Sequence, residues 1–332
     1  MRSRSGRPTL EEVAARAGVG RGTVSRVING SPQVSPRVRR AVEQAIDELG
    51  YVPNRAARSL VTQRTDTVAL VVSESGERFF AEPYFGRMVQ AVSAALAETP
   101  YHLLMAIAQS PRERRRLEDY LTAQHVDGAI LLALNTNDPL AQHLEEHGVP
   151  TVRVGRPRTV DSAYYVDADN RGGARLAVGY LAERGRRRIA TIAGPQDLDV
   201  GVARLAGYRD GVDEPLVAYG DFSEASGAAA MNELLARHPD LDAVFAASDA
   251  MAAAAIRVLK QAGRRVAADV AVIGFDDSAL AQHTDPALTS VTQPVAEMGR
   301  AMVELLLARV RGEQVSHREV VLDTRLVVRE SA

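Results

Sequence analysis

The stretch VGRGTVSRVING, residues 19–30, decides how the N-terminal fifth of the chain folds. Residues 18–20 contain two glycines that interrupt a helical pattern, and the residues after them predict a short helix from Thr23 to Ile28. Asn29-Gly30 is a stop signal, because both residue types accept the left-handed backbone in which many helices end. The stretch therefore predicts a glycine-containing turn followed by a short helix.

Helices are also predicted on both sides of this stretch. Thr9 offers an N-cap and Glu12 completes a capping box, so a first helix is expected to run to about Arg16. Ser35-Pro36 begins a third helix, which Gly50 ends. Apolar positions recur at helical spacing, so three short helices share one small core in a helix-turn-helix arrangement.

Charge is distributed unevenly along the 332 residues, whose net charge is −2. Residues 1–66 hold twelve Arg against six acids, a charge of +6, which leaves −8 for the remainder. A basic head on an acidic body indicates that the head approaches a polyanion. A solvated basic tail is the alternative that charge alone leaves open.

The remainder of the chain predicts an α/β fold. Apolar runs that suit buried strands alternate with amphipathic stretches, and these runs are 68–72, 103–107, 129–134, 152–154, 188–192, 243–247 and 270–273. This alternation is typical of doubly wound parallel sheets. About 265 residues exceed one comfortable sheet, so we expect two lobes.

Composition excludes several classes of protein. No apolar run approaches the roughly 20 residues that span a bilayer, and none follows the N-terminal arginines, so we expect neither membrane association nor a secretory leader, and a cytoplasmic location. The chain has no Cys, and its single lysine, Lys260, precedes Gln261, which excludes a Walker A sequence. His143 and His147 have zinc-ligand spacing, but Leu144 stands where a zincin needs Glu. We expect no metal, no cofactor and no enzymatic activity.

The head sequence resembles the lactose and galactose repressor (LacI/GalR) family. The resemblance rests on TLEEVAARAGVGRGTVSRVINGSPQVS (9–35) and ELGYVPNRAARSL (48–60), and it continues in order through VDADNRGGA, ARLAGYRD, AASDAMA, VIGFDD and LTSVTQP. It implies a DNA-binding head over 1–52, a hinge helix and linker over 53–66, and a periplasmic-binding-protein-like ligand domain over 67–332. The N-lobe is expected at about 67–167 and 294–318, and the C-lobe at about 168–293 and 319–332.

The resemblance makes residues 21–28 a recognition helix in the major groove. Arg26 is suited to bind a guanine through two hydrogen bonds, and Arg21 is a second candidate. Gly22 presents no side chain to a base. Other side chains reach phosphates or base edges, and the expected DNA-binding residues are Thr9, Gly20, Arg21, Thr23, Ser25, Arg26, Asn29 and Ser35.

By the same resemblance, the hinge enters the minor groove at the operator centre. Leu60 is expected to wedge open a base step, while Ala57 allows close approach and Asn54 anchors the segment. Packing within the linker is the alternative role for Leu60. The expected target is a pseudo-palindrome with G-rich half-sites and a central CpG step, bound by a homodimer.

The resemblance also implies an effector pocket at the carboxyl ends of the strands. Asp169, Arg204, Asp276 and Gln293 are expected to line it, and Ser248 stands where many relatives have Asn. Phe80 and Tyr84 stack on a sugar or belong to the core. Carboxylates and guanidinium groups suit sugar hydroxyls, because both form charge-assisted hydrogen bonds.

These features together predict a DNA-binding transcriptional repressor controlled by a small carbohydrate, for which cellobiose is our first expectation. Three alternatives remain. A transport-type solute-binding protein shares the two-lobed fold but leaves residues 1–66 without a role. A sugar-modifying enzyme needs a catalytic set that the sequence does not display. A regulator that responds to a non-sugar metabolite keeps the head and changes only the ligand.

Overall fold

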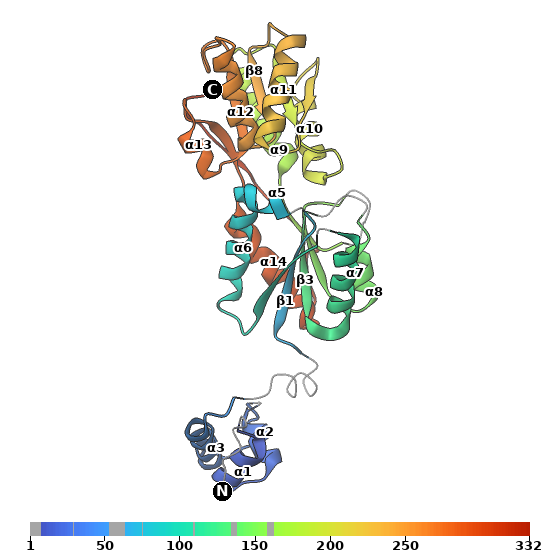
Figure 1. The fold of residues 1–332 in the computed structure, drawn as a ribbon, viewed down its shortest axis with the longest axis vertical. Coiled ribbons are helices and arrows are strands. Elements are labelled where there is room, and N and C mark those ends of the chain that lie inside the picture. The colour runs from blue at the N-terminus through green and yellow to red at the C-terminus, as the bar shows by residue number, and fades with distance from the viewer. Residues whose placement is uncertain are drawn as a thin grey trace. The chain divides into compact units, whose positions relative to one another are not determined.

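The computed structural model describes residues 8–28, 30–52, 64–74, 76–108, 110–133, 138–157 and 163–332. The chain forms two compact units, 1–65 and 66–332, which are called the head and the body below (Figure 1).

The described part of the head contains three helices, as the sequence predicts. They are α1 (Leu10–Ala17), α2 (Arg21–Ile28) and α3 (Pro36–Leu49). Thr9 caps α1 in a complete capping box with Glu12. Helix α2 has the bounds that the resemblance implies and begins two residues earlier than the sequence pattern alone predicts, because the amides of Thr23 and Val24 donate to the carbonyl of Gly20 and so extend the first turn. Val13, Val24 and Val42 each come from a different helix and form the centre of the core.

The first lobe of the body is a six-stranded sheet in the order β11-β5-β4-β3-β1-β2, with every pairing parallel. Its strands are β1 (Thr67–Val72), β2 (His102–Ile107), β3 (Gly128–Leu132), β4 (Thr151–Val154), β5 (Tyr165–Ala168) and β11 (Glu319–Leu322). The helical segments are α5 (Gly76–Ala81), α6 (Pro83–Leu96), α7 (Pro111–Tyr120), the single turn η1 (Leu121–His125), α8 (Leu140–Glu146) and α14 (Val295–Val310). Helices α6 and α14 pack on one face, and α8 and η1 pack on the other.

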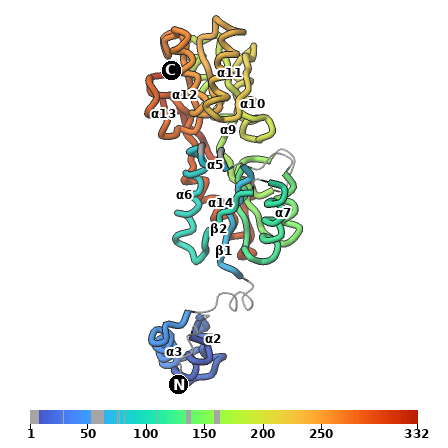
Figure 2. The backbone as a smooth tube through the Cα atoms, viewed as in Figure 1, coloured from blue at the N-terminus to red at the C-terminus, as the bar shows by residue number. Residues whose placement is uncertain are grey.

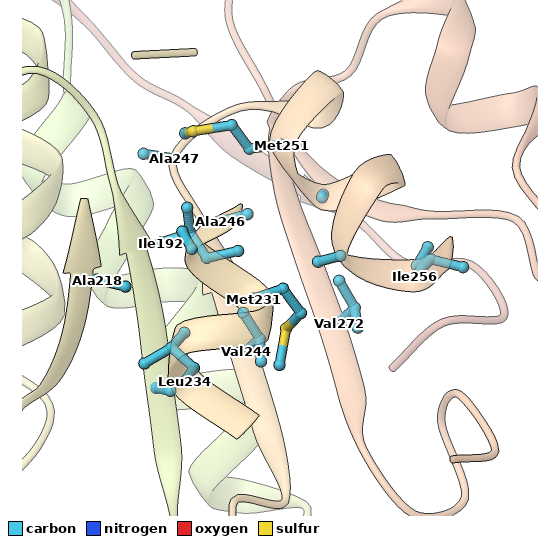
Figure 3. Close-up of a cluster of buried hydrophobic side chains, with 14 of the residues drawn as sticks. Ile192, Ala218, Met231, Leu234, Val244, Ala246, Ala247, Met251, Ile256 and Val272 are labelled. Atoms are coloured by element: carbon cyan, nitrogen blue, oxygen red, sulfur yellow. The ribbon is translucent and has the colours of Figure 1, made fainter. Parts of the chain in front are cut away.

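The second lobe is a six-stranded sheet in the order β12-β10-β9-β8-β6-β7. Its strands are β6 (Ile189–Ala193), β7 (Leu216–Tyr219), β8 (Ala243–Ala246), β9 (Ala271–Asp276), β10 (Thr289–Thr292) and β12 (Arg325–Val327), of which β12 alone runs antiparallel. Its helices are α9 (Asn170–Glu183), α10 (Asp199–Arg209), α11 (Glu224–Arg237), α12 (Asp249–Gln261) and α13 (Ala279–His283). Figure 3 shows the cluster that joins α11 and α12 to this sheet, with Met231 beside Val244 and Met251 beside Ala247. These features confirm the prediction of an α/β body with two lobes.

The chain passes between the lobes three times, after β5, after β10 and after β11 (Figure 2). The third passage corrects one predicted boundary, because we expected residues 319–332 in the C-lobe. Strand β11 pairs with β5 in the first lobe, in the register Glu319 to Tyr165, and the Tyr165 hydroxyl donates to Glu319 at 2.8 Å. The second lobe therefore resumes only at β12.

Candidate functional sites: recognition helix and interlobe cleft

Helix α2 presents arginine side chains on the surface of the head. Val24 and Val27 are buried and hold the helix to the core, whereas Arg21 and Arg26 are exposed. The Arg26 Nε donates to the carbonyl of Gly22 at 3.2 Å. Its two terminal amino groups take no part in that bond. Arg21 pairs with Glu11 at 2.9 Å, and its side chain is 74% exposed. A polyanion can replace Glu11 as the partner of Arg21 at little cost in free energy, because exposed ion pairs contribute little to stability.

The other predicted DNA-binding residues have different surroundings. Thr9 and Ser35 are exposed N-caps, Gly20 is exposed, and Thr23 and Ser25 are half-buried. Only Thr9 of the two caps accepts a side-chain hydrogen bond, from the amide of Glu12. Four predicted residues lie outside the described part of the chain, namely Asn29, Asn54, Ala57 and Leu60.

A cleft lies between the two lobes of the body, near α5 in Figure 1. The first lobe contributes Glu74, Arg78, Glu82, Tyr84, Phe85, Leu132, Ala133, Val154, Gly155 and Asp167 to its lining, and the second contributes Asn170, Leu198, Asp199, Val200, Arg204, Phe222, Asp276 and Gln293. Most of these residues stand at the carboxyl ends of strands or in the helices that follow. This is where doubly wound sheets bind ligands.

Arg204 of α10 organises the second-lobe wall. It is 3% exposed, and its nitrogens donate to the Oδ1 of Asn170 at 2.9 Å, the carbonyl of Ala247 at 2.6 Å and the Oδ1 of Asp276 at 3.1 Å. The Phe275 ring covers the guanidinium at 3.7 Å. The buried charge is therefore both paired and hydrogen-bonded, which burial requires.

Asp276 ends β9 in a strained backbone conformation. Its φ of 101° lies in a region that residues with a side chain rarely adopt, at a cost of about 1 to 3 kcal/mol. Gln293 also donates to its Oδ1, at 2.6 Å. The strain and the two donors fix one carboxylate at the mouth of the cleft, where it is suited to accept a ligand hydroxyl.

The first-lobe wall is acidic. Burial raises the pKa of Asp167 to about 6 and also raises the pKa of Glu82. Arg78 offsets this charge, because it pairs with Glu74 at 2.8 Å and with Glu82 at 2.7 Å. The wall thus offers acceptors for hydroxyl groups and disfavours anions.

Several contacts join the lobes across the cleft. Arg87 donates to the carbonyls of Asp276 at 2.7 Å and of Asp277 at 3.4 Å. Arg78 lies over the Phe222 ring at 5.3 Å. Arg153 and Asp199 approach to 3.9 Å. A ligand in the cleft would change the balance of these contacts, and with it the relative population of open and closed arrangements.

Four of the seven predicted effector residues line the cleft: Tyr84, Arg204, Asp276 and Gln293. The other three do not. Phe80 is 79% exposed, on the solvent side of α5. Asp169 caps α9 by accepting from the amide of Gly172, and Ser248 caps α12 by accepting from the amide of Met251.

Sequence reasoning missed Asn170, Asp167, Glu82, Asp199 and Phe222. Asn170 and Asp167 belong to the quoted motif VDADNRGGA. They lie one position after and two positions before Asp169, the residue that was predicted instead. The available signal in the sequence was a polar residue between two apolar ones, since Asp167 stands between Val166 and Ala168 in strand β5. For Glu82 and Phe222 the sequence held no comparable signal.

No cluster of metal ligands is evident within the described ranges. No group of three or more potential ligands comes together there, and the rings of His143 and His147 have their centroids 4.3 Å apart and are tilted by 45°. Among those residues, no helix is long and apolar enough to cross a membrane.

Comparisons with known proteins agree with this geometry. Residues 9–54 match the model of bacterial regulatory proteins, lacI family, and residues 178–332 match a periplasmic binding protein-like domain. The chain is 58% identical to the HTH-type transcriptional regulator CelR of Thermobifida fusca, over 98% of both chains. The structure of a transcriptional regulator CelR-cellobiose complex is 56% identical, with a TM-score of 0.78 over 98% of this chain and 100% of that one. The lac repressor dimer bound to operator and the anti-inducer ONPF is 28% identical, with a TM-score of 0.85 over 98% and 99%.

Proposed function

The chain belongs to the lacI family of bacterial regulatory proteins, and we propose that it is a transcriptional repressor whose hold on operator DNA is controlled by a small carbohydrate. The observation that carries this proposal is 58% identity to a transcriptional regulator over 98% of the chain, which includes the head and the body together. A transport-type binding protein shares the body fold alone, and an enzyme would need a catalytic set.

We assign DNA recognition to the head. Arg26 and Arg21 read guanines, while Thr9, Gly20, Thr23, Ser25 and Ser35 serve phosphates or base edges. The proposal also divides the N-terminal part of the chain into a DNA-binding domain at 1–52 and a hinge at 53–66, and it includes the roles of Asn29, Asn54, Ala57 and Leu60. A homodimer places two heads on a pseudo-palindrome, since one small head makes few contacts.

The cleft takes the effector in this proposal, with Arg204, Asp276 and Gln293 as polar contacts and Tyr84 and Phe222 as apolar walls. Cellobiose is the first candidate, since a similar regulator is named in complex with it. Because the target is DNA, we place the protein in the cytoplasm. The sugar releases DNA only if it binds the DNA-free protein more tightly than the DNA-bound protein. The free-energy difference between these two affinities is typically about 1 to 3 kcal/mol.

Selection of binding sites from random duplexes tests the DNA function. We expect an inverted repeat with G-rich half-sites and a central CpG, and weaker binding when cellobiose is added. An enriched motif without inverted symmetry would contradict the dimeric head. Release by a non-sugar metabolite, with no response to any saccharide, would favour the alternative ligand class.

A further inference from the structure

Arg87 reaches from one lobe of the body to the other. It belongs to α6, which packs beside α14 in the first lobe (Figure 1). Its terminal amino groups donate to two backbone carbonyls of the second lobe, that of Asp276 at 2.7 Å and, over a longer distance of 3.4 Å, that of Asp277. Arg87 is half-buried and is not among the residues that line the cleft. It therefore holds the backbone of a cleft residue without facing the space that a ligand would fill.

The turn that accepts these bonds is fixed within the second lobe. Asp276 and Asp277 have φ of 101° and 44°, which residues with a side chain rarely adopt. The amide of Asp277 donates to the hydroxyl of Ser290 at 3.1 Å, and Arg329 pairs with the Asp277 carboxylate at 2.7 Å. Ser290 belongs to β10 and Arg329 follows β12, so the turn moves together with the second lobe.

Arg87 thereby sets the width of the cleft at the proposed effector site. Tyr84 lies about one turn before Arg87 on α6 and lines the first-lobe wall, whereas Asp276 lines the second-lobe wall. The bond from Arg87 to the carbonyl of Asp276 fixes the separation of these two walls. A ligand that contacts both walls binds best at one separation, so its affinity depends on an arginine that it does not touch.

A cost offsets the bonds that Arg87 makes. A charged donor bonds strongly to a carbonyl, which favours the closed arrangement of the lobes. The Nε of the same guanidinium is buried and meets no hydrogen-bond acceptor among the described residues. Opening of the lobes would break the two bonds and would also admit water to this Nε. The closed arrangement is therefore only modestly favoured, and a ligand can shift its population.

We propose that Arg87 is a positioning residue of the effector site, which ties the first lobe to the backbone of the Asp276 turn and so holds the cleft at the width that the ligand needs. This rests on the proposed function, since it concerns the regulation of the same site. Loss of the two bonds lowers the population of the closed arrangement. The apparent affinity for the ligand then falls in proportion, although every contact with the ligand is intact.

Alkylation of a single thiol tests the effect on closure without any ligand. The chain has no Cys, so Val200→Cys places one thiol in the cleft lining of the full-length protein, and its rate of reaction with iodoacetamide reports opening. Adding Arg87→Met, which removes every donor, should raise this rate about twofold or more. Arg300→Met is the matched control, because Arg300 is exposed in the same lobe and pairs with Glu297 on its own helix. It should leave the rate unchanged.

Isothermal titration with cellobiose tests the effect on affinity. Arg87→Met should weaken binding about twofold or more, and Arg300→Met should bind like the wild type. Arg87→Lys keeps one charged donor and should fall between the wild type and Arg87→Met in both experiments. Thermal melting without ligand verifies folding, and Arg87→Lys carries both tests if Arg87→Met melts at a lower temperature.

The outcomes separate this proposal from the proposed function. An unchanged alkylation rate in the Arg87 variants would overturn the positioning role, even if cellobiose binding were lost, because Arg87 would then act on the ligand directly. Faster alkylation with wild-type affinity would also overturn it, because the width of the cleft would not matter to the ligand. Faster alkylation in a protein that binds no saccharide would support the hold of Arg87 on the lobes and contradict the proposed effector class.

Discussion

The two candidate sites hold their side chains in opposite ways. On α2, Val24 and Val27 carry the stability, while Arg21 and Arg26 remain exposed and are free to meet a partner. In the cleft, the buried Arg204 is held by the groups that are available to a ligand. The proposed binding role and the stability therefore belong to different residues in the head and to the same residues in the cleft.

The largest test of this contrast is Arg204→Ala. It removes the buried member of the ion pair with the half-buried Asp276, together with the three hydrogen bonds of the guanidinium, so we expect a loss of about 3 to 5 kcal/mol in the free energy of unfolding of the body. Urea denaturation measures it. The matched control is Arg171→Ala, which breaks an exposed pair with Asp210 and should cost less than about 1 kcal/mol. Equal losses would show that Arg204 contributes to binding alone.

A second test uses the pH dependence of stability and concerns Asp249, whose pKa is raised in part by the charge of Asp276 in the cleft. Asp249, at the start of α12, is 2% exposed and accepts from the amide of Ser278 at 2.6 Å and the hydroxyl of Ser290 at 2.5 Å. Burial, and then the charge of Asp276, raise its pKa from 3.8 to about 7. The folded protein keeps this proton to a higher pH than the unfolded chain, so stability is lost as pH rises from about 4 to 7.

Asp249→Asn removes this titration and should flatten the decline. At 1.36 kcal/mol per pKa unit, the difference from wild type is at most about 4 kcal/mol across that range. Urea denaturation at several pH values between 4 and 8 measures it. Parallel curves for the two proteins would show that Asp249 is ionised throughout.

The same contrast explains what the sequence predicts well. The capping box at Thr9, the break at residues 18–20 and the stop at Gly50 are local signals, and all three helices of the head follow from them. The two-lobed body follows from the periodicity of its strands. Arg204, Asp276 and Gln293 came from the resemblance to a family, and the structure brings them together.

The misses depend on partners that are distant in the sequence. Strand β11 was expected in the wrong lobe, because the strand with which it pairs, β5, lies some 150 residues earlier. Asp169 was expected in the cleft, but the first turn of α9 uses its carboxylate as a cap. Arg153 lies within an apolar strand pattern, and only the packing of two lobes places Asp199 opposite it.

On the head side, Arg26→Ala should weaken operator binding by about 1 to 3 kcal/mol and relax the preference at one base pair, with no measurable loss of stability. Fluorescence anisotropy on the selected operator and on single-base variants measures it. Arg40→Ala is a close control, since Arg40 is also exposed and donates its Nε to a carbonyl four residues earlier, that of Pro36. It should leave base preference unchanged. If Arg26→Ala lowered the stability of the head, residues proposed to bind DNA would also stabilise the fold, and the two sites would not differ in this respect.

The smallest effect concerns the two N-caps of the head, Thr9 and Ser35. The Thr9 hydroxyl accepts from the amide of Glu12, whereas Ser35 makes no side-chain cap bond. Replacing a working cap by Ala costs about 1 kcal/mol, because one helix-end amide loses its acceptor. Thr9→Ala should therefore lower hydrogen-exchange protection in α1 about fivefold, while Ser35→Ala should leave α3 within twofold of wild type. Because both hydroxyls are proposed phosphate contacts, both variants should weaken operator binding. A loss of DNA affinity in Ser35→Ala without loss of protection would show that, in the head, binding is separable from folding even at a helix cap.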